Sequence, residues 1–269
     1  MNNWDKQYIE LCERILRDGE RVQNRTGVDT IKVFGHTMRF NLAEEFPILT
    51  SKFVAWKSAI LEMMWIYQVQ SNDVNWLTER GVKIWNEWAG EDGTIGTAYG
   101  WIVKRFGLTQ RLINTLKTNP QDRRMVMSLW QDEYLATANL PSCVWNSQWN
   151  VTNGKLNLIV TQRSCDVALG LPFNVTQYAI LAMLIAQVTG HEIGEMLWVI
   201  NDAHLYVNQL DGINAQIEKY KQDGCPPPPK LWINPEIKNF FAFDNSRALS
   251  DIKLENYEYN MKINMPVAV

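Results

Sequence analysis

The sequence predicts an α+β fold in a single domain spanning residues 1–269, with most of its strands in the middle of the chain. Three observations favour this class. With 46% hydrophobic and 20% charged residues, the chain has the composition of a globular protein with a substantial core. Apolar residues recur at helical spacing near both ends and alternate at strand spacing between them. No internal repeat and no shift in composition marks a second domain.

The composition also argues against several classes of partner. A net charge of -3 and a pI near 5.7 disfavour nucleic acid or a membrane surface as the main partner. The first twenty residues are amphipathic and charged rather than a secretory signal, and no apolar run approaches the ~18 residues that cross a bilayer. We therefore expect a cytoplasmic protein. The cysteines are too widely spaced for a CxxC motif, and three histidines offer no zinc set, so we predict free thiols and no metal.

Each element follows from its local pattern. A first helix is predicted from apolar residues at helical spacing after Asn2 and Asn3, with Gly19 ending it. Residues 30–40 alternate and are rich in β-branched and aromatic residues, which predicts a half-buried strand. Residues 54–70 are apolar on nearly all sides, which predicts a core helix.

The second half of the chain follows in the same way. Residues 89–100 form a Gly-rich loop that lacks both the GK[ST] ending of a P-loop and the setting of a dinucleotide fingerprint. Two β-rich stretches within residues 144–162 flank Asn153-Gly154, a strong hairpin signal. Helices are predicted over residues 173–189, ending at Gly190, and over residues 204–220, before a connector of four prolines.

The hairpin brings reactive side chains together. A two-residue turn pairs Thr152 with Lys155, and an unbulged ladder then sets Cys143 opposite Ser164 and Val144 opposite Arg163. One bulge would shift this pairing by a residue. A nearby Arg favours the thiolate, so Cys143 is a candidate nucleophile. The alternative is a small buried residue in a strand, the commoner role of a free cysteine.

Other residues suggest anion binding and proton transfer. Arg25, Arg123, Arg124 and Arg163 could bind a phosphate bidentately, although a single arginine is more often an ordinary solvated surface charge. Glu62 lies among apolar residues of the helix at 54–70, so burial should raise its pKa. Glu62 is then a proton-transfer group or the partner of a buried Arg. Trp85 and Trp88 could form an aromatic wall for a flat ligand, although core packing is the commoner role of either residue alone.

Several segments resemble thymidylate synthases in the same order over nearly the whole chain. They are Arg25-Thr26-Gly27, EFPILTSK, LEMMW, IWNEWAGEDGTIGTAYG, DRRMVMSLW, LPSCVWNSQW, QRSCDVALGLPFNVTQYA, NDAHLYVN and PVAV. The resemblance implies a large mixed β-sheet packed with helices, one sheet face forming a homodimer interface. It also implies reductive methylation of dUMP to dTMP. In that reaction 5,10-methylenetetrahydrofolate is both one-carbon donor and reductant, dihydrofolate is the product, and no nicotinamide is needed.

The resemblance also implies residue roles. Cys143 would add to uracil C6, Glu62 would relay protons, Tyr99 would lie near the C5 proton, and Asn174 would read the uracil edge. Around the phosphate and deoxyribose of dUMP the implied residues are Arg25, Arg163 and Ser164 of the same subunit, Arg123 and Arg124 of the other subunit, and His204 and Tyr206 on the 3′-hydroxyl. For the folate they are Asp166 on the pterin, Lys52 on the glutamate tail, and the enclosing Trp85, Trp88, Leu169, Gly170 and Val269.

The chain departs from the family pattern at Val144, where most members have His, so the water network near uracil O4 must differ. It also has NDAHLYVNQ in place of the usual GDxHLYxNH, and a shorter segment after Tyr99-Gly100. The nearest alternative is a dUMP hydroxymethylase of the same fold. Asn174 argues against a cytosine-specific form, which has Asp there. A non-catalytic RNA-binding regulator is disfavoured by the acidic pI.

Overall fold

A six-stranded mixed sheet forms the centre of the protein, and the computed structural model describes residues 2–267. Neighbouring strands are antiparallel except for one parallel pair, β5 with β6. This confirms the predicted α+β class with a large mixed sheet. In spatial order the strands are β1 (Glu20–Val22), β2 (Thr30–Asn41), β6 (Glu192–Tyr206), β5 (Lys155–Asp166), β4 (Val144–Thr152) and β3 (Val126–Ser128).

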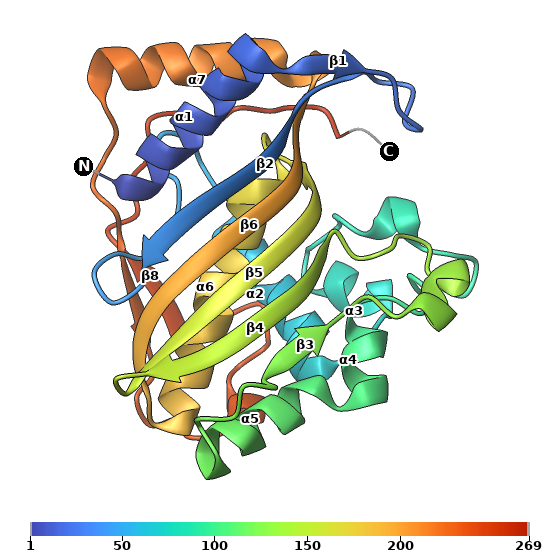
Figure 1. Cartoon of the computed structure of the whole chain (residues 1–269), viewed down its shortest axis with the longest axis vertical. Coiled ribbons are helices and arrows are strands. Elements are labelled where there is room, and N and C mark those ends of the chain that lie inside the picture. Colours follow the sequence, from blue (N-terminus) through green and yellow to red (C-terminus); the bar gives the residue numbers. More distant parts are fainter. Residues whose placement is uncertain (1, 268–269) are drawn as a thin grey trace.

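Helices cover one face of this sheet. In Figure 1, α2 (Trp56–Met64) and α6 (Gly170–Thr189) lie behind the strands, and no helix of the described residues covers the near face along β4 and β5. The other elements are α1 (Asn3–Asp18), η1 (Trp65–Val69), α3 (Val74–Glu79), η2 (Asn86–Trp88), α4 (Gly100–Phe106), α5 (Leu108–Thr118), η3 (Asp132–Thr137), η4 (Val207–Gln209), α7 (Leu210–Asp223), β7 (Lys230–Ile233), η5 (Phe240–Ala242) and β8 (Ile252–Glu255).

Helix α6 is the central core helix. Its length and mean hydropathy of 1.4 would suffice for a membrane span, so the expectation that no apolar segment approaches that length is wrong. However, 78% of the apolar stretch of α6 is buried inside the protein, where the helix packs against α2 and the sheet. Gly190 ends the helix in the left-handed conformation, with φ of 75°, as its position in the sequence predicts.

The hairpin is confirmed, with one change of register. Asn153 and Gly154 have φ of 53° and 76°, as a type I′ turn requires, and Thr152 pairs with Lys155. The ladder is shifted between Val144 and Asn146, so the unbulged pairing of Cys143 with Ser164 is wrong. The bulge places Cys143 beside Arg163 instead.

Two predicted helices have different bounds. The helix predicted from residue 204 is wrong at its start, because His204 and Tyr206 end strand β6 and α7 begins only at Leu210. The helix predicted over residues 54–70 is α2 followed by the π-helix η1, an arrangement that is frequent near functional sites.

At the N-terminus the Asn2 side chain caps α1, accepting from the backbone N–H groups of Trp4 and Asp5.

Candidate active site

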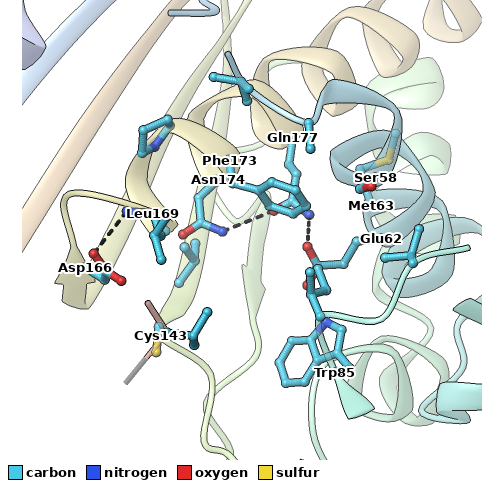
Figure 2. Close-up of a pocket in the computed structure, with 18 of the residues that line it drawn as sticks. Ser58, Glu62, Met63, Trp85, Cys143, Asp166, Leu169, Phe173, Asn174 and Gln177 are labelled. Carbon is cyan, nitrogen blue, oxygen red and sulfur yellow. Dashed lines mark hydrogen bonds between the residues drawn. The ribbon is translucent and has the colours of Figure 1, made fainter. Parts of the chain in front are cut away.

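A cavity of about 740 Å³ opens between the C-terminal part of β5, the first turns of α6, and α2. Figure 2 shows Cys143 and Asp166 on one side of this space, Glu62 and Trp85 on the other, and Asn174 and Gln177 between them. The structure thus brings together side chains from distant parts of the sequence. The predicted site residues that line the cavity are Lys52, Glu62, Trp85, Trp88, Tyr99, Cys143, Asp166, Leu169, Gly170 and Asn174.

Cys143 directly precedes β4 and is held in place by hydrogen bonds to Arg163 and Tyr99. The backbone N–H of Arg163 donates to the Cys143 carbonyl at 2.9 Å. The Arg163 guanidinium donates from Nε to the carbonyl of Ser142 at 3.0 Å and from Nη2 to the carbonyl of Pro141 at 2.8 Å. The Tyr99 hydroxyl accepts from the backbone N–H of Cys143 at 3.1 Å. Arg163 therefore fixes the segment that carries the thiol as well as supplying a charge beside it.

The pKa of the Cys143 thiol results from opposing effects. Burial raises this pKa, while the charges of Arg163 and Arg25 and a hydrogen bond from Tyr99 lower it, and burial prevails. The expected influence of the arginines is present, but it does not bring the pKa below its ordinary value. Attack by sulfur therefore depends on a group that removes the thiol proton.

Glu62 on α2 is a buried carboxyl with two donors. Its oxygens accept hydrogen bonds from the Trp85 indole N–H and the Gln177 side-chain amide. Burial raises the pKa of Glu62 to about 7, although both hydrogen bonds act to lower it. The predicted rise in pKa is confirmed. A carboxyl with a pKa near neutrality can both give and take a proton under physiological conditions.

Asn174 belongs to a continuous chain of amides. Its Oδ1 accepts from Gln162 Nε2 at 3.2 Å, and its Nδ2 donates to Gln177 Oε1 at 3.2 Å. Gln162 in turn accepts from the indole N–H of Trp198 at 3.1 Å. Sequence reasoning missed Gln162 and Gln177. A polar residue inside an otherwise apolar helix such as α6 was the available signal for Gln177.

His204 and Tyr206 lie at the end of β6 next to the cavity. Asp166, which lines the cavity, pairs with His204 across the parallel strands, and the rings of His204 and Tyr206 meet edge to face at 5.3 Å. His204 Nδ1 lies 2.7 Å from Asp202 Oδ1, and Lys32 Nζ lies 3.1 Å from Asp202 Oδ2. Asp202, which was not predicted, thereby fixes the ring orientation of His204.

The family model described as thymidylate synthase matches residues 6–269. This chain belongs to the thymidylate synthase family. It is 51% identical to a thymidylate synthase of Clostridium beijerinckii and 42% identical to one of Bacillus subtilis subsp. natto, with 100% of each chain covered. A solved structure of thermostable thymidylate synthase A from Bacillus subtilis has a TM-score of 0.92 at 41% identity and covers 99% of both chains.

Membership of the thymidylate synthase family makes this protein a methyltransferase. It confirms the resemblance drawn from the sequence.

The phosphate residues expected from thymidylate synthases do not all meet in one chain. Arg163 and Ser164 lie on β5 beside Cys143, and the charge of the exposed Arg25 reaches the thiol. Arg123 and Arg124 are exposed and do not line the cavity, and Arg124 forms an ion pair of 2.8 Å with Asp122. The described residues of one chain therefore hold an incomplete set of predicted phosphate ligands.

On the predicted folate side, Asp166 is ordered by its neighbours. Its Oδ1 accepts from the backbone N–H groups of Ala168 and Leu169 at 2.9 and 3.1 Å, and Gln209 Nε2 donates to its Oδ2 at 3.4 Å. Gln209 also donates to the carbonyl of Pro266 at 3.2 Å, which connects the C-terminal segment to this part of the cavity. Val269, predicted to enclose the folate, lies outside the described residues.

Lys52 lines the cavity but is buried, with its ammonium donating to the Ala168 carbonyl and, at 3.3 Å, to the Tyr8 hydroxyl. Burial lowers its pKa to about 8. In this conformation Lys52 binds protein groups rather than facing solvent. Among residues 2–267 there is no cluster of three or more His, Cys, Asp or Glu side chains that could hold a metal ion.

Proposed function

We propose that this chain converts dUMP to dTMP, with 5,10-methylenetetrahydrofolate as one-carbon donor and reductant and dihydrofolate as the second product. One observation carries the proposal: Cys143 and Glu62 face the same cavity from opposite sides, and the hydrogen-bonded amides of Asn174 and Gln177 line the space between them. A flat pyrimidine between them would present C6 to the sulfur and its amide edge to Asn174.

The chemistry follows from these positions. The Cys143 sulfur adds to C6, its proton leaves, and the electron pair of the C5–C6 bond moves toward C5 and O4, so that C5 becomes nucleophilic. C5 would then bond to the folate methylene carbon as the first of that carbon's two bonds to folate nitrogen breaks, and the C5 proton would depart on the side of Tyr99. Loss of this proton would break the second carbon–nitrogen bond, a hydride from the folate would reduce the resulting methylene to methyl, and the sulfur would be expelled. Glu62 would move protons around O4 and the folate.

The aromatic side chains that line the cavity support a folate site. Trp85 is buried and packs edge to face with Trp88 at 5.8 Å between ring centroids. Leu169, Gly170 and the C-terminal Val267 line the same space. These groups would cover the pterin and keep water from the reactive methylene, while Asp166 would bind the ring nitrogens. Val144, which replaces the usual His, adds no ionisable group to this cavity.

We further propose that the active form is a cytoplasmic homodimer, each chain being one catalytic domain. The open sheet face carries exposed apolar side chains, with Phe34 on β2 83% exposed and Ile159 on β5 38% exposed. Such residues favour a protein contact. Docking by this face would let Arg124 leave Asp122, and Arg123 and Arg124 would then complete the phosphate site of the partner.

The dimer can be tested by complementation. A Cys143→Ser chain and a chain carrying Arg123→Glu and Arg124→Glu should each be inactive alone. If the arginines act across the interface, mixing and refolding the two should restore activity, because one site of the mixed dimer has both the sulfur and intact partner arginines. No recovery in mixed dimers isolated by two affinity tags would contradict the arrangement.

The reaction itself is tested by incubating the purified protein with dUMP and methylenetetrahydrofolate. Dihydrofolate is followed by absorbance, and the nucleotide product is identified by mass spectrometry. We expect dTMP and dihydrofolate in equal amounts from the wild type and from a Cys225→Ser control, and neither from Cys143→Ser. Hydroxymethyl-dUMP without dihydrofolate would identify a hydroxymethylase instead, and absence of turnover would reject an enzymatic role on dUMP.

A further inference from the structure

Gln177 occupies a special place in the amide chain that crosses the cavity. Figure 2 shows it between Asn174 and Glu62, joined to each by a hydrogen bond. It is buried and extends from α6, whereas Glu62 belongs to α2. Among the described residues, Gln177 is therefore the side chain that connects the Glu62 carboxyl to the Asn174 amide by hydrogen bonds.

The series of hydrogen bonds runs from Trp198 through Gln162, Asn174 and Gln177 to Glu62, and the residues at its two ends fix which group donates in each bond. An indole N–H can only donate, so Trp198 requires the oxygen of Gln162 to face it. Gln162 must then offer its nitrogen to Asn174 Oδ1, and Asn174 Nδ2 donates to Gln177 Oε1. At the other end, Glu62 accepts from Gln177 Nε2 and from Trp85, whose indole is again donor-only.

Reversing any single amide would break this order. If Asn174 turned over, its NH₂ would face the NH₂ of Gln162 and its oxygen would face the oxygen of Gln177. Both contacts would lose a hydrogen bond and leave buried polar groups without partners. Asn174 therefore has one preferred orientation, with one remaining N–H and one oxygen lone pair free for a ligand.

That orientation matches one of two pyrimidine bases. Uracil presents an acceptor at O4 beside a donor at N3, which complements a free amide N–H beside a free amide oxygen. Cytosine presents the opposite pattern, with an amino group at C4 and an acceptor at N3, so the same amide would place donor against donor and acceptor against acceptor. Accepting cytosine would require the amide of Asn174 to reverse.

We propose that Gln177 is a positioning residue that locks the Asn174 amide in the orientation that selects uracil over cytosine. The inference rests on the proposed function, because it assumes that Asn174 reads the base of a pyrimidine nucleotide. It adds that selectivity depends on a residue that does not itself need to touch the base. Without Gln177, only Gln162 would oppose reversal of Asn174.

The test is a comparison of nucleotide binding by wild type and Gln177→Met, a variant of similar size that cannot hydrogen-bond through an amide. Dissociation constants for dUMP and dCMP are measured by titration calorimetry, so that no turnover of dCMP is needed. A matched control is Gln187→Met, which removes from the same helix a glutamine whose amide donates to the carbonyls of Asn234 and Ile237 at 2.9 Å.

We expect the ratio of the dCMP to the dUMP dissociation constant to fall roughly tenfold in Gln177→Met, the effect of losing about one amide hydrogen bond in the locked orientation. The ratio should stay unchanged in Gln187→Met, even if both variants lower the melting temperature. A second readout is the pH profile of dUMP turnover. The hydrogen bond from Gln177 lowers the pKa of Glu62, so its loss raises that pKa. The part of the rate-against-pH curve that reflects ionisation of Glu62 should therefore move to higher pH.

Each outcome decides a different point. The inference is overturned, and the proposed function is left intact, if the wild type binds dUMP and the ratio of dissociation constants is the same in Gln177→Met. A wild type that fails to bind dUMP overturns both. A lowered ratio in the Gln187→Met control as well would show a general loss of packing in α6 and would also overturn the specific role of Gln177.

Discussion

Replacing Glu62 by Gln should change how the stability of the protein depends on pH. The pKa of Glu62 rises from 4.5 to about 7 because the carboxyl is buried. Each pKa unit corresponds to about 1.4 kcal/mol, so ionising this group costs the folded state about 3 kcal/mol. A glutamine at the same position does not titrate and avoids this cost.

The sign follows from the two pKa values. Below the unfolded value of 4.5 the carboxyl is protonated in both states, and the wild type has its full stability from this group. As the pH rises toward about 7 only the unfolded state ionises, so the free energy of unfolding falls, and it levels off once the folded carboxyl also ionises. Relative to wild type, Glu62→Gln should therefore gain about 3 kcal/mol between about pH 4.5 and about pH 8.

Urea unfolding followed by tryptophan fluorescence, at one protein concentration and several pH values, measures this difference. The glutamine also places an amide N–H against the donor of Trp85 or Gln177, a cost of about 1–3 kcal/mol that is the same at each pH and cancels in the comparison. Glu44→Gln, on an exposed loop, makes the same charge change as a control. A pH-independent difference between Glu62→Gln and wild type would refute the assignment of Glu62 as a buried carboxyl of raised pKa.

Three further predictions test the surroundings of the site. Cys143→Ser should abolish dTMP formation but keep dUMP binding in calorimetry; retained turnover would exclude the sulfur as nucleophile. Asp202→Ala should lower kcat/KM for dUMP about tenfold by releasing His204, and an unchanged value would remove Asp202 from the site. Gly100→Ala should lower stability by at least about 1–3 kcal/mol in thermal unfolding, because the added carbon would lie 2.0 Å from the carbonyl oxygen of Ser71; a normal melting temperature would contradict this packing.

Local patterns in the sequence were sufficient for much of the fold. Asn153-Gly154 predicts its hairpin because only residues that tolerate positive φ fit a type I′ turn. The bulge next to Val144 left no such signal, since it depends on how the strand packs against β5. At His204 the polar residues of NDAH broke the strand pattern, and a helix was predicted where β6 continues, because pairing with β2 and β5 overrides local preference.

The site shows the same division between local and tertiary information. Glu62 could be recognised because its apolar helical neighbours alone imply burial and a raised pKa. Gln177 left one local signal, as a polar residue inside the apolar helix α6, but Gln162 and Asp202 left none, because their importance comes from partners that are distant in the sequence. The net pKa of Cys143 was also beyond reach, since it depends on how far burial outweighs the arginine charges.

If the proposed function holds, the Cys143 sulfur is joined to the pyrimidine while the methyl group is made. The most direct measurement uses dUMP carrying fluorine at C5 together with methylenetetrahydrofolate, because fluorine cannot leave C5 as a proton does and the reaction should stop with all bonds in place. After proteolysis, mass spectrometry should find the nucleotide and the folate on the peptide that contains Cys143. An adduct on another cysteine, or no adduct in a preparation that converts dUMP to dTMP, would contradict the account.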